Sequence, residues 1–146
     1  MGDETFDIVI DAGLVTLSIQ EELLFLPKSV DKLTEESPVV LRSVMDALQG
    51  NPLLKLTIVG HTDNKPNPRR NTDNWEYAAL RATFLANELA QTYYLSPNRV
   101  IAASNGEYRP ATSNATEEGR KKNRRVEFVL RNNVENLLRA LGKLEK

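Results

Sequence analysis

Apolar residues recur at every second position in two short stretches near the start of the chain. The first set is Phe6, Ile8 and Ile10, and the second is Val15, Leu17 and Ile19. A period of two is that of a strand with one buried face, and residues 11–13 between the two sets end in a glycine that favours a turn. The pattern predicts a β-hairpin with one face buried.

The next apolar pattern has the period of a helix. Its members are spaced by three and four residues: Leu41, Val44, Met45 and Leu48. Ser37 suits the N-cap, Pro38 suits the first helical position, and Gly50 suits the helix end. We therefore expect a helix over about 37–49, after a loop that reaches residue 36.

Strand and helix patterns alternate through the middle of the chain. Residues 54–58 alternate and predict a strand that ends at Gly60, and residues 61–73 form a polar loop. Asp73 followed by Glu76 is a variant of the capping box, so a long helix is expected from there to about Tyr93. Its apolar stripe consists of Ala78, Ala82, Leu85 and Leu89.

The last third of the chain continues this alternation. We expect a strand at 100–103, a polar loop at 104–115, a short helix near 116–122 and a strand at 126–130. An extra C-terminal helix over about 132–146 is predicted by an apolar stripe at helical spacing, made of Val134, Leu137, Leu138 and Leu141. The whole predicts one α/β domain over 1–146, an α+β sandwich in which helices pack on one face of a mixed sheet behind a leading hairpin.

Composition narrows the class of protein. The 146 residues are 40% hydrophobic, which is enough for one core without disulfides. With 19 basic and 20 acidic side chains the net charge is -1, which argues against a uniformly basic nucleic-acid binder. The sequence contains no cysteine, which excludes a thiol nucleophile, a cysteine zinc site and a disulfide. No apolar run approaches the roughly 18 residues of a membrane-spanning helix.

The sequence offers little support for catalysis. His61 is the only histidine, so a histidine metal site is disfavoured. A Ser-His-Asp site built on His61 and Asp63 lacks the strand–turn–helix elbow of a nucleophilic serine. A glycine-rich phosphate loop is also missing. We expect no catalytic residue, metal or cofactor, and a structural role for His61.

A binding site is a stronger hypothesis. Asp63 follows a strand directly, a place where loops display binding groups. Asn74 and Arg81 are seven residues apart, so on a helix they lie within about 20° of each other. From there Arg81 can project toward the Asp63 loop. An acid and a guanidinium around a cleft can hold a zwitterion, but a simple salt bridge between Asp63 and Arg81 explains the same pattern.

Five basic residues fall within 120–125. A run of this kind can contact a polyanion. Acidic residues flank it, at Glu117, Glu118 and Glu127, and the chain as a whole is nearly neutral. We expect a solvated or internally paired face and no nucleic-acid partner.

Three ordered blocks resemble the OmpA-like domain, a peptidoglycan-binding module of bacterial envelope proteins. Residues 60–63 resemble its Gly-x-Thr-Asp loop, residues 74–82 its Asn-x-x-Leu-Ser-x-x-Arg-Ala helix start, and residues 119–127 its Gly-Arg-x-x-Asn-Arg-Arg-Val-Glu block. The resemblance runs from about residue 13 to 130 and is strongest to the MotB branch, the stator proteins of the flagellar motor. The chain departs from the pattern at Tyr77-Ala78 and in residues 26–29.

The resemblance implies non-catalytic binding of peptidoglycan through the diaminopimelate-type end group of its stem peptide. Carried over residue by residue, Asp63 and Arg81 grip the ligand, Asn74 and Arg124 support the site, and Thr62 and Asn64 shape the loop. It also implies a homodimer in the periplasm or cell envelope. The chain is then expected to be part of a longer protein tethered to the inner membrane, with a stator membrane protein as a partner. The alternatives are an envelope interaction or dimerisation module with a degenerate pocket, and a cell-wall hydrolase.

Overall fold

The computed structural model describes residues 6–11, 13–132 and 141–142. In this part of the chain a mixed sheet has the strand order β1-β2-β5-β3-β4. The strands are β1 (Phe6–Asp11), β2 (Leu14–Gln20), β3 (Leu54–His61), β4 (Val100–Gly106) and β5 (Arg125–Asn132). β3 and β4 are parallel, and the other neighbours are antiparallel. The predicted mixed sheet with a leading hairpin is therefore confirmed.

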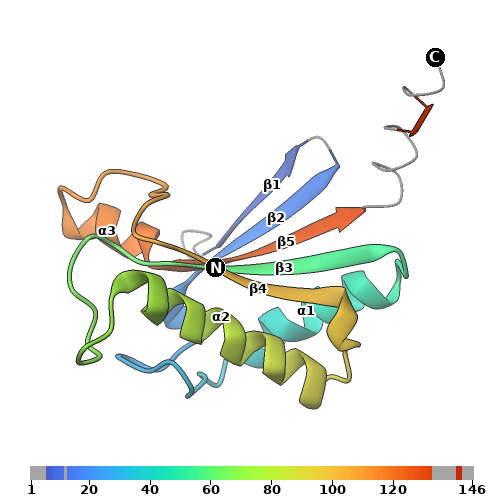
Figure 1. Ribbon diagram of the computed structural model, residues 1–146, viewed down its shortest axis with the longest axis horizontal. Coiled ribbons are helices and arrows are strands. Elements are labelled where there is room, and N and C mark those ends of the chain that lie inside the picture. The colour runs from blue at the N-terminus through green and yellow to red at the C-terminus, as the bar shows by residue number, and fades with distance from the viewer. Residues whose placement is uncertain (1–5, 12, 133–140, 143–146) are drawn as a thin grey trace.

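Two long helices cover one face of this sheet. They are α1 (Ser37–Gln49) and α2 (Asn74–Gln91), and Figure 1 shows both on the same side of the strands. A shorter helix, α3 (Glu117–Asn123), lies near the end of the sheet where β3 and β4 finish. Single 3-10 turns follow β2 (η2, Glu21–Leu23) and precede β4 (η3, Pro97–Arg99). The predicted packing of helices on one face is confirmed.

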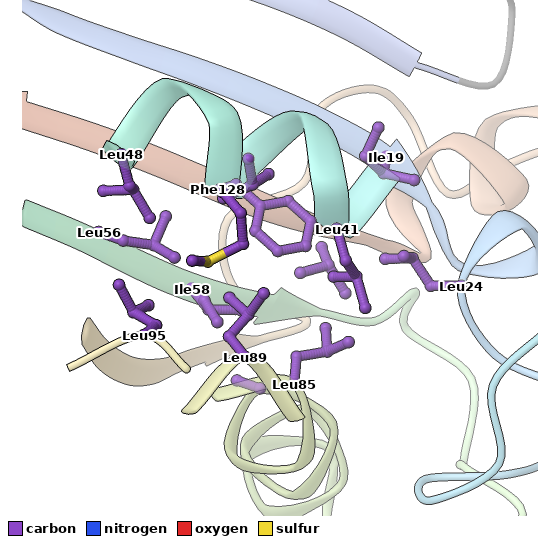
Figure 2. Close-up of a cluster of buried hydrophobic side chains, with 14 of the residues drawn as sticks. Ile19, Leu24, Leu41, Leu48, Leu56, Ile58, Leu85, Leu89, Leu95 and Phe128 are labelled. Carbon is purple, nitrogen blue, oxygen red and sulfur yellow. The ribbon is translucent and has the colours of Figure 1, made fainter. Parts of the chain in front are cut away.

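The core lies between the sheet and the two long helices. Leu56 and Ile58 of β3 point to the same face, because residues two apart on a strand share a face. Phe128 of β5 joins them, and leucines of α1 and α2 close the cluster from the other side (Figure 2). Each fully buried side chain of this kind contributes about 1.5–3 kcal/mol to folding. The core therefore fixes the strand ends from which the site loops emerge.

The hairpin differs from the prediction in its burial. Ile8 is 55% exposed and Ile10 is 77% exposed, so most of β1 has no buried face. The reason is tertiary, because β1 is the edge strand of the sheet and the hairpin points away from the two long helices (Figure 1). Burial is confined to the end where Phe6 pairs with Ile19.

Several element boundaries also differ. The N-cap of α1 is Glu36, and Ser37 is the first helical residue, its hydroxyl donating to the carbonyl of Thr34 at 2.8 Å. β3 ends at His61 and β4 at Gly106, beyond the predicted ends. Asp73 caps α2 as predicted, accepting from the Glu76 N–H at 2.8 Å, and α2 ends at Gln91. The predicted C-terminal helix lies outside the described residues except at 141–142, which are helical.

Candidate ligand-binding site

Five segments meet at one end of the sheet and line a cavity of about 140 Å³. They are the start of η2 after β2, the loop between η2 and α1, the loop after β3, the first turn of α2, and the junction of α3 with β5. Because β5 pairs with both β2 and β3, Gln20 and His61 both lie opposite Arg125, and the residues next to them converge. The cavity wall includes Glu21, Lys28, Thr62, Asp63, Lys65, Pro66, Asn67, Pro68, Tyr77 and Arg124.

The loop after β3 holds Asp63 in a fixed conformation. The Thr62 N–H donates to the carbonyl of Gly106 at 2.8 Å, and the Thr62 hydroxyl donates to the Asp63 carbonyl at 2.7 Å. The Lys65 N–H donates to Asp63 Oδ1 at 2.9 Å. The Asp63 side chain is 10% exposed, so its carboxylate is largely enclosed by the loop.

Asn74, the first residue of α2, supports this loop from beneath. Its Nδ2 lies 3.3 Å from the Asp63 carbonyl and 3.0 Å from the Lys65 carbonyl. Its Oδ1 accepts from Asn67 Nδ2 at 3.0 Å. A side-chain amide has both donors and an acceptor, so one residue satisfies backbone groups at two points of the loop. Asn74 is 8% exposed, and its role is to position the loop.

Arg124 connects three carboxylates. Its Nη1 lies 2.7 Å from Asp63 Oδ2 and 3.0 Å from Glu117 Oε1, and its Nε lies 3.2 Å from Glu21 Oε2. Partial burial acts to lower the pKa of Arg124, but the hydrogen bonds that Arg124 donates to Glu117 and Asp63 outweigh it and raise the pKa. The hydrogen bond from Arg124 also lowers the pKa of Glu117. Arg124 therefore stays charged at the cavity wall.

Arg81 lies deeper and faces another partner. Its Nη1 pairs with Glu21 Oε1, and its Nε donates to the Ser29 carbonyl at 2.9 Å. The guanidinium lies over two rings, 4.8 Å from the centroid of Phe25 and 4.7 Å from that of Tyr77. Burial raises the pKa of the Tyr77 hydroxyl. Arg81 is thus clamped by an acid, a carbonyl and two aromatic faces.

The structure brings together part of the predicted set of site residues. Thr62, Asp63 and Arg124 line the cavity, while Asn74 lies beneath the loop. Neither Asn64, which is exposed, nor Arg81, which is buried, is part of the cavity wall. Asp63 pairs with Arg124 and Arg81 pairs with Glu21, so the Asp63–Arg81 salt bridge considered from the sequence is wrong.

Sequence reasoning missed Glu21, which accepts from both arginines. The signal that identifies Asp63, an acidic residue directly after a strand, also applies to Glu21 after β2. Lys28 and Tyr77 were missed as wall residues too. Lys28 has a φ of 62°, a left-handed conformation that is uncommon for a residue with a side chain.

His61 is a structural residue at the edge of the site. It is 5% exposed, and its Nε2 lies 2.9 Å from Glu127 Oε1 on β5. Arg125 also contacts Glu127, with Nη2 3.3 Å from Oε2. Burial lowers the pKa of Arg125. These contacts join β3 to β5 just behind the loop that carries Asp63.

The charges of the site suit a small ligand that carries both signs. The carboxylate residues Glu21 and Asp63 line the same cavity as the cationic residues Lys28, Lys65 and Arg124. A cavity of about 140 Å³ has room for several water molecules and therefore admits a small polar group. Within the described residues, no group of three or more metal-ligating side chains is found, and no helix is long and apolar enough to cross a membrane.

Known proteins resemble this chain in sequence. Motility protein B of Bacillus subtilis is 32% identical over 113 residues, which are 75% of this chain and 42% of that protein. The peptidoglycan-binding protein ArfA of Mycobacterium tuberculosis is 36% identical over 91 residues, 62% of this chain and 27% of that protein. The chain therefore spans less than half the length of these relatives.

Solved structures share the fold. A putative MotB-like protein from Desulfovibrio vulgaris superposes with a TM-score of 0.81 and 32% identity, covering 89% of this chain and 80% of that one. The cell wall anchor of the type VI secretion system from Pseudomonas aeruginosa gives a TM-score of 0.78 and 27% identity, with 88% and 89% covered. The profile of the OmpA family matches residues 25–124, which include the cavity wall except for Glu21. The chain belongs to the OmpA family.

Proposed function

We propose that this domain binds peptidoglycan without catalysis and anchors a larger envelope protein to the cell wall. The observation that carries the proposal is the small cavity in which acidic and basic side chains face the same space. Two relatives support it by name, one a peptidoglycan-binding protein and the other a cell wall anchor. Such binding takes place in the periplasm or elsewhere in the cell envelope.

The ligand group that fits this cavity is the amino-acid end of a stem peptide, such as diaminopimelate. In our proposal Asp63 takes its ammonium group, and Arg81 takes its carboxylate with support from Arg124. Because the Glu21 carboxylate forms an ion pair with the Arg81 guanidinium in the free domain, the ligand carboxylate must displace Glu21 from that guanidinium. Thr62 and Asn64 shape the loop around the ligand, and Asn74 holds this loop in place.

The larger protein is proposed to be of the stator type, tethered to the inner membrane and paired with a membrane partner. The resemblance to Motility protein B and to a MotB-like structure supports this proposal. We also propose that the domain acts as a homodimer.

Cosedimentation with purified peptidoglycan tests the function. We expect Asp63→Ala and Arg81→Ala each to abolish retention while circular dichroism shows an intact fold. Losing one partner of a desolvated charge pair costs roughly 2–5 kcal/mol of binding. Asp46→Ala and Arg42→Ala, which remove exposed charges on α1, are the matched controls and should cosediment like the parent.

Other outcomes separate the competing functions. Release of soluble fragments by the parent indicates a hydrolase, and no retention of a folded parent indicates an interaction module. Retention that disappears between low and physiological salt points to the basic residues 120–125, because exposed charges are screened more than enclosed ones. Folded Asp63 and Arg81 variants that still cosediment contradict the assigned site.

A further inference from the structure

Two aromatic rings lie exposed beside the site loop, outside the charged cavity. Trp75 and Tyr108 stack on each other, with ring centroids 5.0 Å apart and planes inclined by 26°. Trp75 is 46% exposed and Tyr108 is 59% exposed. Rings of this size dominate binding energies when they are covered, so a stacked pair left in water has the character of a binding surface. We call this pair the aromatic platform.

The aromatic platform is held rigidly from behind. The Ser104 hydroxyl donates to the Trp75 carbonyl at 2.7 Å, and the Tyr108 N–H donates to the Asn105 carbonyl at 3.0 Å. Gly106, with a φ of 54°, lets the end of β4 approach the start of α2 closely. A Cβ at this position would lie only 3.2 Å from the Trp75 nitrogen. A surface that is already ordered loses little entropy when it binds.

The aromatic platform and the cavity loop share one hydrogen-bonding residue. Asn74, directly before Trp75, donates to the Asp63 and Lys65 carbonyls of the loop. The same Nδ2 lies 3.1 Å from Oε1 of Glu107, the residue directly before Tyr108. Asn74 therefore links the cavity loop to the two segments that carry these rings.

We propose that the aromatic platform binds a sugar ring of the glycan strand while the cavity takes the stem peptide. This inference rests on the proposed function. A sugar ring offers a C–H face that packs on an aromatic ring and hydroxyls at its edge. In the described part of the structure, Trp75 Nε1 and the Tyr108 hydroxyl have no hydrogen-bond partner, so both polar tips are available to those hydroxyls.

A protein partner fits this surface less well. A stable protein interface covers about 800 Å² on each side. Two rings supply at most about 150–250 Å² each, and both are already partly covered by their mutual stacking. The flanking residues 104–107 are mostly polar, which suits hydroxyls better than an apolar protein surface.

Three soluble probes separate the two halves of the ligand. They are the stem peptide alone, the same peptide on its disaccharide, and glycan strands stripped of peptide. For Trp75→Ala and Tyr108→Ala we expect the Kd of the disaccharide-peptide to rise roughly five- to tenfold, the worth of one well-packed ring contact. The Kd of the peptide alone should stay unchanged. Tyr94→Ala, which removes an 87% exposed ring beyond the far end of α2, is the matched control and should change neither value.

A spectroscopic readout complements the affinities. Trp75 is the only tryptophan, so its emission reports directly on the aromatic platform. Stripped glycan should shift that emission in the parent and in Asp63→Ala, and much less in Tyr108→Ala. Equal Kd values for both peptide probes in the parent, or an unchanged emission with glycan, overturn the inference while leaving peptide binding intact. Loss of peptide binding in Trp75→Ala also overturns the inference, because it shows that these rings position the cavity loop instead. Failure of the parent to bind either peptide probe contradicts the proposed function itself.

Discussion

Glu21 joins the two arginines of the site into one ionic chain. Its Oε1 pairs with Arg81 and its Oε2 lies 3.2 Å from Arg124, which in turn contacts Asp63. Each guanidinium therefore has an internal acid in the free domain. A ligand carboxylate can reach Arg81 only by competing with Glu21.

This competition makes Glu21→Gln a sharp test at the level of one residue. The glutamine keeps the shape but removes the competing charge, so we expect the Kd for the stem peptide to fall several-fold. Isothermal titration of the soluble peptide measures the change. Glu22→Gln, at the exposed neighbour that contacts Lys121, is the control. Weaker binding in Glu21→Gln would mean that Glu21 itself receives the ligand ammonium.

The sequence predicted individual site residues where the signal was local. Asp63 follows a strand and lines the cavity, and Asn74 opens a helix and contacts the loop of Asp63, while their role in binding stays a prediction. The partners of the arginines were not predictable in this way. Arg81 meets Glu21 from a segment far back in the chain, and that pairing depends on which strands flank β5.

Close contact between β3 and α2 positions the site at the level of elements. A Cβ built on Gly60 would lie 2.3 Å from the Ala78 carbonyl oxygen, a distance that real contacts do not show. Glycine is therefore required where β3 passes beneath the helix that carries Asn74 and Arg81. The loop with Asp63 begins two residues later.

Gly60→Ala should force β3 and α2 apart. Overpacking of this kind costs about 1–3 kcal/mol, and we expect that loss in urea unfolding together with weaker retention on peptidoglycan. Gly50→Ala is the matched control, because its nearest contact would be an ordinary 3.5 Å. A Gly60→Ala variant as stable as the parent would show that the helix can shift without cost.

The contact between β3 and β5 behind the loop is sensitive to pH. Burial alone raises the pKa of Glu127, but the hydrogen bond and charge of His61, with Arg125, outweigh it and hold the pKa below its ordinary value of 4.5. A carboxyl group with a lowered pKa stabilises the fold above its unfolded pKa, and this contribution is lost as the pH falls through the folded pKa.

Glu127→Gln should therefore be less stable than the parent at pH 7, by about 1.5 kcal/mol for a charged hydrogen bond. That difference should shrink below about pH 4.5, where the parent loses its own contribution. Urea unfolding between pH 7 and pH 3 measures it. Glu118→Gln, on the exposed side of α3, should show a much smaller difference at every pH. A difference for Glu127→Gln that does not vary with pH would assign the effect to packing.

Elements were predictable to the extent that their signals were local. Asp73 and Glu76 marked the start of α2 correctly, because a cap acts within one turn. The burial of the hairpin was not predictable, since apolar alternation does not reveal whether a strand lies at the edge of the sheet, away from the helices. Ile10 alternates like a core residue and is exposed.

For the whole molecule, binding to a polymeric wall favours more than one site. Two linked domains on one polymer gain avidity without any new contact, because the second binding event is intramolecular. The chain spans less than half the length of its relatives. In our proposal the domain is part of a longer protein of that kind, which would hold two copies together. The domain itself carries apolar surface at both ends of the described chain, at Ile10 and at Leu141, which is 45% exposed.

We predict that the domain dimerises, at least weakly, through the apolar stripe of its C-terminal segment. Val134, Leu137, Leu138 and Leu141 recur in the sequence at helical spacing, and the first three lie outside the described residues. Sedimentation velocity over a wide concentration range measures the association, and Leu138→Glu and Leu141→Glu should each weaken it at least tenfold, about 1.4 kcal/mol. Ile10→Glu on the exposed hairpin is the comparison, because β1 is an edge strand that can also pair with a second copy. Loss of dimer in Ile10→Glu alone moves the interface to β1, and a parent that stays monomeric at high concentration removes the dimer from the proposed function.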